Sequence, residues 1–422
     1  MTEQFLSFLW KYQLYDVDTL CVEGEKIAVI SPGEQNSDAG PDFFNAKIKI
    51  GETIWVGNVE IHLKSSDWYR HNHNKDAAFD NVILHVVAQN DQEVYTSKGR
   101  RVVNAEIIFN ERLSENFKSL TNNSKWISCA DKIPAINPVV ITSWLGKAGI
   151  ERLEFRTGQI IDNLEKTVND WEEVFYRQLA RSYGFHVNSQ PFEALAKSIS
   201  YQIVKKHAVN SVQLEALFYG QAGFLLDDYS NDEYYNKLRK EYAFLKEKYG
   251  LKPIDTHLWK FMRLRPGNFP TIRIAQFVGL LRQNTSIFSA VIEAKDLKSF
   301  LNLLSVDVSE YWETHYTFGN LSTFKAKPLG EKSAKVIIIN TIVPILFIYG
   351  KKLGLSQYQD RAIEILEEIK TEDNVIIKEW KHLDIIPKNA FDSQALLHLK
   401  TEYCDKKRCL ECGIGLKIIT MG

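Results

Sequence analysis

The fold class follows from two adjacent segments, SPGEQNSDAGPDFFNAKIKI (residues 31–50) and WVGNVEIHLK (residues 55–64). The first segment opens with a loop rich in Gly, Pro and Asp and continues as a β-rich run. The second alternates polar and apolar residues with the period of two that a strand shows when its two faces differ. We therefore predict two neighbouring strands, preceded by a loop that presents acidic side chains.

The flanking residues extend this pattern into an α-β-β-β-α-β order. Residues 3–13 have the apolar spacing of a helix, and residues 65–81 are polar and in part helical. Runs with strand character occupy residues 26–31, 46–50, 53–63 and 82–87, and a hairpin-like pair follows at 93–97 and 101–109. We expect a mixed α/β module over residues 1–115.

In the rest of the chain the apolar residues recur with a different period. Residues 116–138, with several asparagines and two prolines, predict a linker. Over residues 139–400 the apolar residues recur with helical spacing, which predicts a mostly α-helical domain, and residues 401–422 form a Cys-containing tail. A length of 422 residues fits two or three domains of ordinary size.

The composition is that of a globular protein without a strong charge bias. A net charge of −1 argues against a uniformly basic nucleic-acid coat but allows a local basic surface. The N-terminal residues lack a signal-peptide pattern, and the most apolar later run, Val336–Tyr349, is shorter than the roughly 20 residues of a membrane span. Five unevenly spaced cysteines do not make a disulfide framework. We expect a cytoplasmic protein without a membrane segment.

Acidic residues gather around the two central strands. Alternation puts Glu60, His62 and Lys64 on one face of the second strand. If the first strand pairs with it, Asp42 and Glu60 converge, and Mg²⁺ or Mn²⁺ would relieve the repulsion between the two carboxylates. The alternative for this pair is a structural role in a hydrogen-bonded turn. Two further carboxylates of the loop are either secondary metal ligands or turn caps: Glu34 and Asp38.

The element order, together with Pro41-Asp42 and Glu60-Ile61-His62, resembles the PD-(D/E)XK nuclease superfamily. The resemblance implies a restriction-endonuclease-like α/β core in which Asp42 and Glu60 bind the metal. His62 departs from the lysine that the motif carries, so either Lys64 supplies the missing ammonium group or neutral His62 acts as a general base or a metal ligand. The block from Gly40 onward, with the Cys-rich end, is also similar to an uncharacterised bacterial family known only as a domain of unknown function.

Three further histidines lie close to the motif in the sequence. His71 and His73 are either residues of an exposed helix or site residues, and His85, inside an apolar strand, is either a hydrogen-bonded core residue or an active-site group. With His62 they could form a zinc or iron site that hydrolyses another kind of substrate.

The tail carries the spacing C-x4-C-x2-C, formed by Cys404, Cys409 and Cys412. Closely spaced thiols in a reducing compartment predict one zinc ion or one iron–sulfur cluster, with Cys129 or Cys21 as the fourth ligand. Some members of the nuclease superfamily fasten their chain ends with such a cluster, so the resemblance implies a structural role. The alternative is a set of ordinary reduced thiols.

A basic stretch between Lys252 and Arg282 has aromatic residues interleaved with its cations. This composition favours contact with nucleic-acid phosphates and bases, although basic residues often only solvate a helix. The residues that we expect to contact nucleic acid are Lys260, Arg263, Arg265 and Arg273.

These observations favour a metal-dependent nuclease or a related nucleic-acid-processing protein. The catalytic residues would be Asp42, Glu60, His62 and Lys64, with Mg²⁺ or Mn²⁺ acidifying the attacking water. The alternative is a non-catalytic nucleic-acid-binding or assembly protein that retains the fold, which the missing lysine supports.

Overall fold

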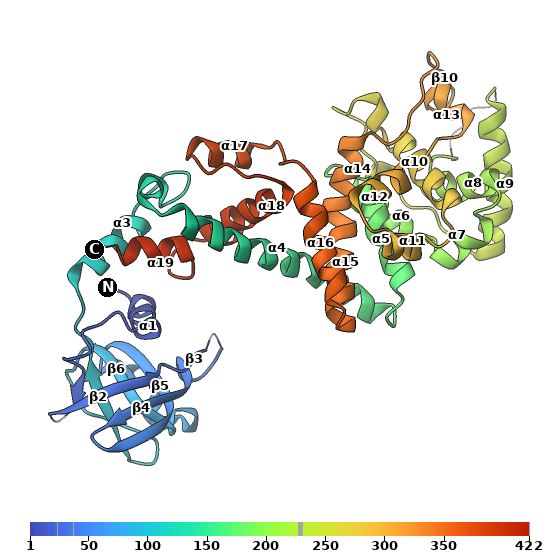
Figure 1. Cartoon of the computed structure of the whole chain (residues 1–422). Helices are drawn as coiled ribbons and strands as arrows, with labels where there is room; N and C mark the ends of the chain where they lie inside the picture. The colour runs from blue at the N-terminus through green and yellow to red at the C-terminus, as the bar shows by residue number, and fades with distance from the viewer. Residues whose placement is uncertain (23, 37, 227–230, 422) are drawn as a thin grey trace. The chain divides into compact units, whose positions relative to one another are not determined.

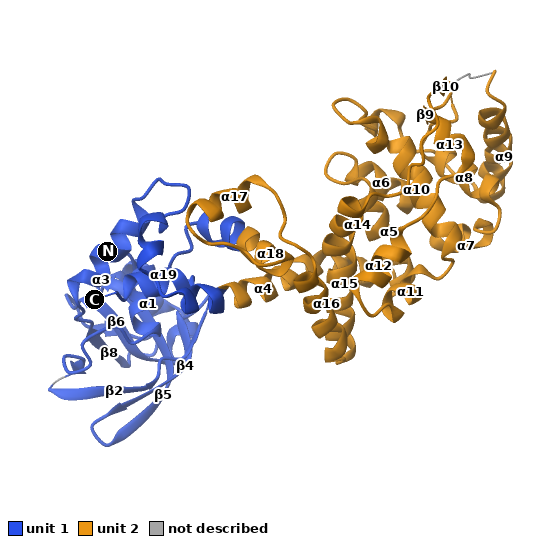
Figure 2. Cartoon of the chain, turned by 45° about the horizontal axis from the view of Figure 1, so that its top comes forward, with its two compact units in different colours: residues 1–144, 399–422 blue, residues 145–398 orange. Residues whose placement is uncertain are grey.

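The computed structural model describes residues 1–22, 24–36, 38–226 and 231–421. The chain forms two compact units, Met1–Trp144 with Leu399–Gly422, and Leu145–His398 (Figure 2). A mixed, curled sheet occupies the N-terminal part and helices dominate the rest, as the sequence predicts (Figure 1). The helix that leads from the first unit into the second is α4 (Pro138–Lys166).

The sheet of the first unit has eight strands in the order β1-β2-β4-β5-β6-β8-β7, with β3 paired to β4. Strands β2, β4 and β5 form an antiparallel meander, β6 pairs parallel to β5, and β8 pairs parallel to β6. The bounds are β1 (Cys21–Val22), β2 (Glu25–Ser31), β3 (Glu34–Gln35), β4 (Phe43–Ile50), β5 (Thr53–Lys64), β6 (Val82–Gln89), β7 (Val94–Tyr95) and β8 (Arg101–Glu106).

A β-bulge at Asn45 sets the register at the start of β4. Ala46 pairs with Gly57, but Phe43 pairs with Val59, so one extra residue lies on β4 between the two pairs. Asn45 has a positive φ of 55° and its amide donates to the Asn58 side chain at 3.4 Å. A shift of one residue moves a side chain to the other face of a sheet. The bulge therefore puts Asp42 opposite Glu60 and on the same face.

Helices cover the sheet and close the first unit. The N-terminal helix α1 buries its apolar residues, among them Phe5 and Trp10, and starts at Thr2, whose hydroxyl accepts a hydrogen bond from the Phe5 amide at 3.3 Å. The segment predicted as a linker contains the end of α3 and the turn η3. The bounds in this unit are α1 (Glu3–Lys11), α2 (Asp67–Arg70), η1 (His73–Lys75), η2 (Ala77–Phe79), α3 (Glu111–Thr121), η3 (Ala130–Ala135), η7 (Leu399–Cys404) and α19 (Gly413–Ile419).

The second unit packs its helices around one large apolar core. Aromatic residues from separate helices meet there, for example Tyr176 stacked on Phe277 with ring centroids 5.9 Å apart. The bounds are α5 (Trp171–Tyr183), α6 (Ser189–Ser198), α7 (Tyr201–His207), α8 (Ser211–Gln221), α9 (Glu233–Tyr249), η4 (Thr256–Leu258), η5 (Pro266–Asn268), α10 (Pro270–Gln283), α11 (Ile287–Glu293), α12 (Leu297–Leu304), α13 (Glu310–Thr314), β9 (His315–Thr317), β10 (Asn320–Leu321), α14 (Glu331–Ile337), η6 (Ile338–Ile342), α15 (Val343–Leu353), α16 (Ser356–Glu368), α17 (Val375–His382) and α18 (Ala390–His398).

One helical stretch, Glu331–Leu353, is long and apolar enough to cross a membrane by length and composition alone. It comprises α14, the π-helical turn η6 and α15, and 72% of its most apolar window is buried inside the protein. Burial against neighbouring helices gives its apolar residues the partners that lipid would otherwise supply. The stretch has the surroundings of a core helix.

Candidate functional site

Backbone amides of the two strands hold Asp42 and Glu60 next to each other. The Asp42 amide donates to Glu60 Oε2 at 3.1 Å, and the Ile61 amide donates to Asp42 Oδ2 at 3.0 Å. One oxygen of each carboxylate therefore accepts a hydrogen bond from a backbone amide of the opposite strand. Glu60 is buried, with 6% of its surface exposed, while Asp42 is half-buried. The structure thus brings the two acids together at the junction of β4 and β5.

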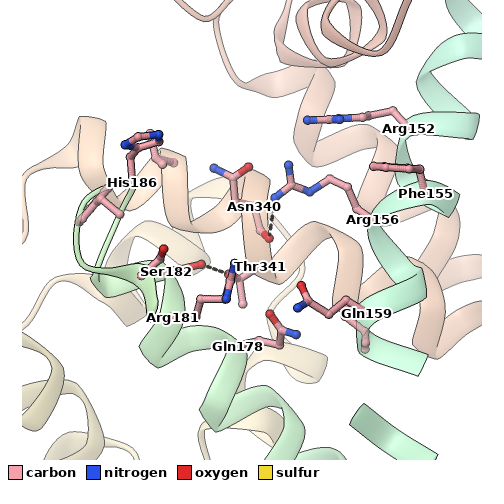
Figure 3. Close-up of a pocket in the computed structure, with 14 residues that line it drawn as sticks. Arg152, Phe155, Arg156, Gln159, Gln178, Arg181, Ser182, His186, Asn340 and Thr341 are labelled. Carbon is pink, nitrogen blue, oxygen red and sulfur yellow. Dashed lines mark hydrogen bonds between the residues drawn. The ribbon is translucent and has the colours of Figure 1, made fainter. Parts of the chain in front are cut away.

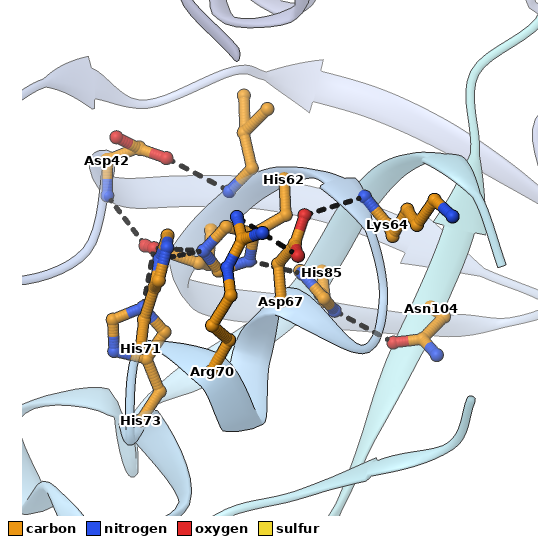
Figure 4. A network of polar contacts seen from close by, with 11 residues as sticks. Asp42, His62, Lys64, Asp67, Arg70, His71, His73, His85 and Asn104 are labelled. Atoms are coloured by element: carbon orange, nitrogen blue, oxygen red, sulfur yellow. Dashed lines mark hydrogen bonds and ion pairs between the residues drawn. The ribbon is translucent and has the colours of Figure 1, made fainter. Parts of the chain in front are cut away.

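His62 continues the site into a chain of buried hydrogen bonds (Figure 4). His62 Nδ1 lies 2.8 Å from His85 Nε2, and His85 Nδ1 lies 3.0 Å from Asn104 Oδ1. The Asn104 amide group donates to the Gln92 carbonyl at 2.8 Å, which fixes Oδ1 as the acceptor.

This chain assigns the tautomer of His62. Because Asn104 Oδ1 can only accept, His85 carries its proton on Nδ1 and offers a lone pair at Nε2. His62 must then donate from Nδ1, so the lone pair of its Nε2 lies on the other side of the ring and faces His71 Nδ1, which is 3.0 Å away. A histidine fixed in this way by its outer nitrogen is typical of metal ligands.

His71 and His73 reach the same point from the segment after α2. Asn72, between them, has a left-handed φ of 64°, which turns both flanking side chains toward β5. The His73 ring stacks on Phe79 with a centroid distance of 3.7 Å and lies at 5.4 Å from the Trp68 ring. Apolar packing thus fixes the orientation of His73.

The ring nitrogens of three histidines converge, and Glu60 lies beside two of them. His62, His71 and His73 each offer one ring nitrogen, and these atoms lie within 4.8 Å of one another. Glu60 Oε1 lies 3.6 Å from His62 Nε2 and 3.3 Å from His73 Nε2. His73 Nε2 is buried and makes no hydrogen bond within the described residues, so among them its polar contact is the Glu60 carboxylate. Three imidazoles and a carboxylate fit a divalent transition metal such as Zn²⁺, Fe²⁺ or Mn²⁺.

Burial shapes the electrostatics of this group, which we call the His–Glu cluster (Glu60, His62, His71 and His73). Burial, followed by the charges of the neighbouring histidines, lowers the pKa of His62 to about 2. Burial likewise lowers the pKa of His85 to about 4. Both rings are therefore neutral at pH 7, as metal ligation requires. Burial and the nearby Glu60 charge raise the pKa of Asp42 to about 7.

Other predicted site residues lie outside the cluster. Lys64 is exposed, and its side chain points away from Asp42 in Figure 4 while its amide donates to Asp67 at 3.1 Å. Glu34 and Asp38 are also exposed, and within the described residues no hydrogen bond or ion pair joins their carboxylates to Asp42 or Glu60. Asp38 instead belongs to a turn held by Asn36, whose side chain accepts from the Asp38 amide at 2.9 Å.

Cys129 and the three cysteines of the tail line one small cavity of about 20 Å³ in the first unit. Burial and the neighbouring cysteines raise the pKa of Cys129 to about 12, and burial raises that of Cys412 to about 11. Gly415 lies so close that a Cβ atom there would be 2.0 Å from the Cys409 carbonyl oxygen. Cys21 is exposed and does not line this cavity.

Of the four residues predicted to contact nucleic acid, three are exposed in the structure and one is buried. Lys260, Arg263 and Arg265 are exposed in the segment between α9 and α10. Arg273 is buried, with 6% exposed, and its guanidinium group donates to Asn268 at 2.7 Å and lies 4.4 Å from the Phe185 ring centroid. Arg273 therefore does not belong to an exposed phosphate-binding surface, because it lies on the inward face of α10.

Sequence reasoning missed three asparagines that shape the site. Asn45 makes the bulge, Asn72 turns the histidine segment, and Asn104 fixes the tautomers of His85 and His62. The first two have positive φ values, which asparagine tolerates better than most residues do, but asparagine is common in ordinary turns. Only His85, a polar residue in an apolar strand, carried a signal that pointed to Asn104.

Comparison with known proteins yields one match. A search of curated proteins and a search of solved structures each found none. The family model described as "Protein of unknown function (DUF2851)" matches residues 3–375, a range that contains the whole His–Glu cluster. Because the match covers most of the chain, the protein belongs to this family.

Proposed function

We propose that the protein is a metal-dependent hydrolase of phosphodiester bonds, with its metal held by the His–Glu cluster. The observation that carries the proposal is the fixed tautomer of His62, whose Nε2 lone pair faces His71 and Glu60. This lone pair belongs to a group of three imidazoles, and one of them, His73, has a buried Nε2 that makes no hydrogen bond within the described residues.

The donor set changes the metal that we expect. Mg²⁺ favours oxygen ligands, whereas three imidazoles favour Zn²⁺, Fe²⁺ or Mn²⁺. Neutral His62 does not replace the ammonium group of the lysine in the PD-(D/E)XK motif, and the Lys64 side chain points elsewhere. The proposed chemistry therefore resembles that of a histidine–carboxylate metal site more than that of the motif.

Two features favour phosphodiesters as the substrate class. The antiparallel meander followed by parallel strands, with Asp42 and Glu60 opposite each other, has the element order of the nuclease superfamily. The exposed cations Lys260, Arg263 and Arg265 suit a polyanionic substrate. We include in this proposal that the α/β core has a restriction-endonuclease-like fold.

The protein residues have separate roles in the proposed reaction. When bound, a divalent cation supplies a Lewis acid that polarises the phosphoryl oxygen and acidifies water. Glu60, His62, His71 and His73 hold it, and His71, which is exposed, marks the side open to substrate. Asp42, whose amide donates to Glu60 Oε2 at 3.1 Å, lies next to the cluster and is placed to accept the proton of the attacking water.

The test combines metal analysis with cleavage assays. Protein purified without chelators should contain about one equivalent of a transition metal and should cleave labelled single-stranded DNA, double-stranded DNA or RNA when Mn²⁺ or Zn²⁺ is supplied. Glu60→Gln and His73→Gln should lose the metal and at least roughly 100-fold of the rate, since they remove a ligand. Glu34→Gln, which removes an exposed carboxylate of the neighbouring loop, should keep both.

Two results would contradict this proposal. Cleavage that is unchanged in Glu60→Gln and His73→Gln would place the reaction elsewhere. Nucleic-acid binding without cleavage in the presence of each metal would favour the non-catalytic alternative.

We also propose that Cys129, Cys404, Cys409 and Cys412 hold a zinc ion or an iron–sulfur cluster with a structural role. Four thiols around one cavity repel one another when ionised, and a bound cation removes that cost. The π-helical turn η7 (Leu399–Cys404) ends at Cys404 and so brings the tail to Cys129.

A further inference from the structure

A second site lies in the helical unit, in a cavity of about 750 Å³. Its walls come from α4, α5 and the turn η6 (Figure 3). The α4 wall consists of residues spaced as one face of a helix: Arg152, Phe155, Arg156 and Gln159. A volume of this size suits a small organic ligand.

Three guanidinium groups line the cavity, those of Arg152, Arg156 and Arg181. Arg181 pairs with Glu193, which is shared with Lys197 at 2.6 Å. Arg156 has no carboxylate within ion-pair distance among the described residues, and its hydrogen bond to the Asn340 carbonyl is long, at 3.5 Å. Arg152, one helical turn before Arg156, adds a third positive charge and donates to the Gln394 side chain at 3.1 Å.

The pKa of Arg156 responds both to burial and to the neighbouring guanidinium groups. Burial, followed by the charges of Arg152 and Arg181, lowers its pKa to about 10 against the opposing effect of Glu372. Burial raises the pKa of Glu372, whose carboxylate is occupied by the Gln394 amide at 2.5 Å. A ligand with negative charge would remove the repulsion between the guanidinium groups.

Neutral polar groups complete the wall opposite α4. In a regular helix the Asn340 carbonyl would accept from the residue-344 amide, but Pro344 has no such hydrogen. The π-helical turn η6 turns Asn340 and Thr341 toward the cavity, where Thr341 hydrogen-bonds to Ser182. Turns of this kind are frequent at functional sites.

The aromatic residue Phe155 lines the cavity and is also exposed to solvent. Its exposed fraction is 60%, and it lies on α4 between Arg152 and Arg156. An exposed ring beside guanidinium groups is an arrangement that proteins use to stack a base while they bind the adjacent phosphate.

We propose that this cavity binds a nucleotide unit, with the phosphates at Arg152, Arg156 and Arg181 and the base on Phe155. Two sources offer this chemistry, a free nucleoside diphosphate and the 5′-phosphorylated end of a nucleic-acid strand. The site lies wholly in the second unit, and it does not depend on the hydrolysis proposed for the first.

The experiment measures binding at low salt by calorimetry with ADP, inorganic pyrophosphate and a short oligonucleotide with or without a 5′-phosphate. The full-length protein should bind ADP or the phosphorylated oligonucleotide at least about tenfold more tightly than pyrophosphate or the unphosphorylated strand. Tighter binding of ADP or of the strand identifies the source. Arg156→Gln should weaken binding about 10- to 100-fold, because a charge-assisted hydrogen bond is lost.

Matched variants separate this site from general electrostatics. Lys166→Gln removes one charge from the exposed end of the same helix and should change binding less than twofold. Arg156→Lys keeps the charge and should lose less than Arg156→Gln, and Phe155→Leu should weaken ADP binding but not pyrophosphate binding. Absence of binding by every probe, or equal binding by wild type and a folded Arg156→Gln protein, would overturn the proposal. Equal affinity for pyrophosphate and ADP would overturn the assignment of a base.

Discussion

A histidine at position 62 and a lysine there would do opposite things to the charge of the site. A lysine would bring a permanent ammonium group close to Glu60, whereas the buried imidazole is neutral and offers a lone pair. A lysine at this position would stabilise an anion, whereas the neutral imidazole offers its lone pair to the cation that we propose. This is why we propose a transition metal for the site, although the sequence around its two acids resembles the nuclease motif.

The lone pair of His62 depends on His85, which leads to our first prediction. His85→Phe removes the acceptor that holds the proton on His62 Nδ1, so His62 can shift its proton to Nε2. We expect metal affinity to fall about 10- to 100-fold, as is usual when an outer-shell partner of a histidine ligand is lost. Competition with a chromophoric chelator measures the affinity.

The control for this variant is His257→Phe, which changes an exposed histidine of the second unit. It should bind metal as the wild type does. Unchanged affinity in a folded His85→Phe protein would show that the tautomer is not what prepares His62.

The second prediction concerns the carboxyl group of Asp42 in metal-free protein. Its pKa of about 7 lies above the ordinary value of 3.8, so between these values the folded state binds the extra proton. The resulting stabilisation is complete below pH 3.8 and is lost as the pH rises through 7. Asp42→Asn should therefore exceed wild type in stability at pH 8 by roughly 1–3 kcal/mol, since each pKa unit is worth about 1.4 kcal/mol and partial exposure reduces the total.

Denaturant titrations in EDTA at pH 8 and pH 4.5 test this expectation. The advantage of Asp42→Asn should shrink at the lower pH, where the wild-type carboxyl is largely protonated in the folded state. A difference that does not depend on pH would mean that the Asp42 carboxyl ionises normally.

In strand β4, one backbone irregularity decides which side chains lie on the face of the site. The bulge at Asn45 carries Asp42 to the face of Glu60. Our third prediction is that Asn45→Val, a β-branched residue disfavoured at positive φ, impairs cleavage at least roughly tenfold, because the register of the first residues of β4 shifts. Asn45→Gly tolerates the same φ and should retain most of the activity.

Crystal structures or amide exchange of both variants provide the check. If Asn45→Val kept the reciprocal bonds between Asp42 and Glu60 and still lost activity, the register would not be the cause. Full activity in Asn45→Val would show that the bulge forms without the asparagine.

Much of the element pattern could be predicted because its signals are local. The alternation over residues 53–63 and the helical period over residues 171–183 correspond to β5 and α5. The period over residues 191–207 predicts one helix, but the structure divides it into α6 and α7. There the Tyr201 amide donates to the buried Glu173 side chain at 2.7 Å, a contact between distant residues that periodicity does not encode.

The site was predictable only where neighbouring strands define it. Asp42 and Glu60 follow from strand pairing, but the approach of His71 and His73 depends on the turn at Asn72 and on packing against Phe79. The arginine-lined cavity has no sequence signal, because Arg156 and Arg181 come from different helices and resemble ordinary surface cations in sequence.

The two units have separate cores, so they should unfold separately, and this leads to our fourth prediction. Cys404→Ser should abolish binding of zinc or of an iron–sulfur cluster and lower the transition temperature of the first unit while that of the second stays constant. Differential scanning calorimetry, elemental analysis and visible absorption of protein purified without air measure these effects.

Cys21→Ser provides the control, since Cys21 is exposed and lies outside the cavity. It should change neither the metal content nor the calorimetric trace. Wild-type protein that contains no zinc or iron and has the same transitions as Cys404→Ser would leave the four cysteines as ordinary thiols.

The return of Leu399–Gly422 to the first unit affects how the chain matures on the ribosome. In most proteins of several domains the N-terminal domain is completed first during synthesis. Here the Asn116 side chain binds the carbonyl groups of Ile419 and Met421 at 3.2 and 3.1 Å, so the first unit stays unfinished until the second has been translated. The unit that starts first would be the last to mature, and the nascent sheet would need protection from aggregation while the helical unit is made.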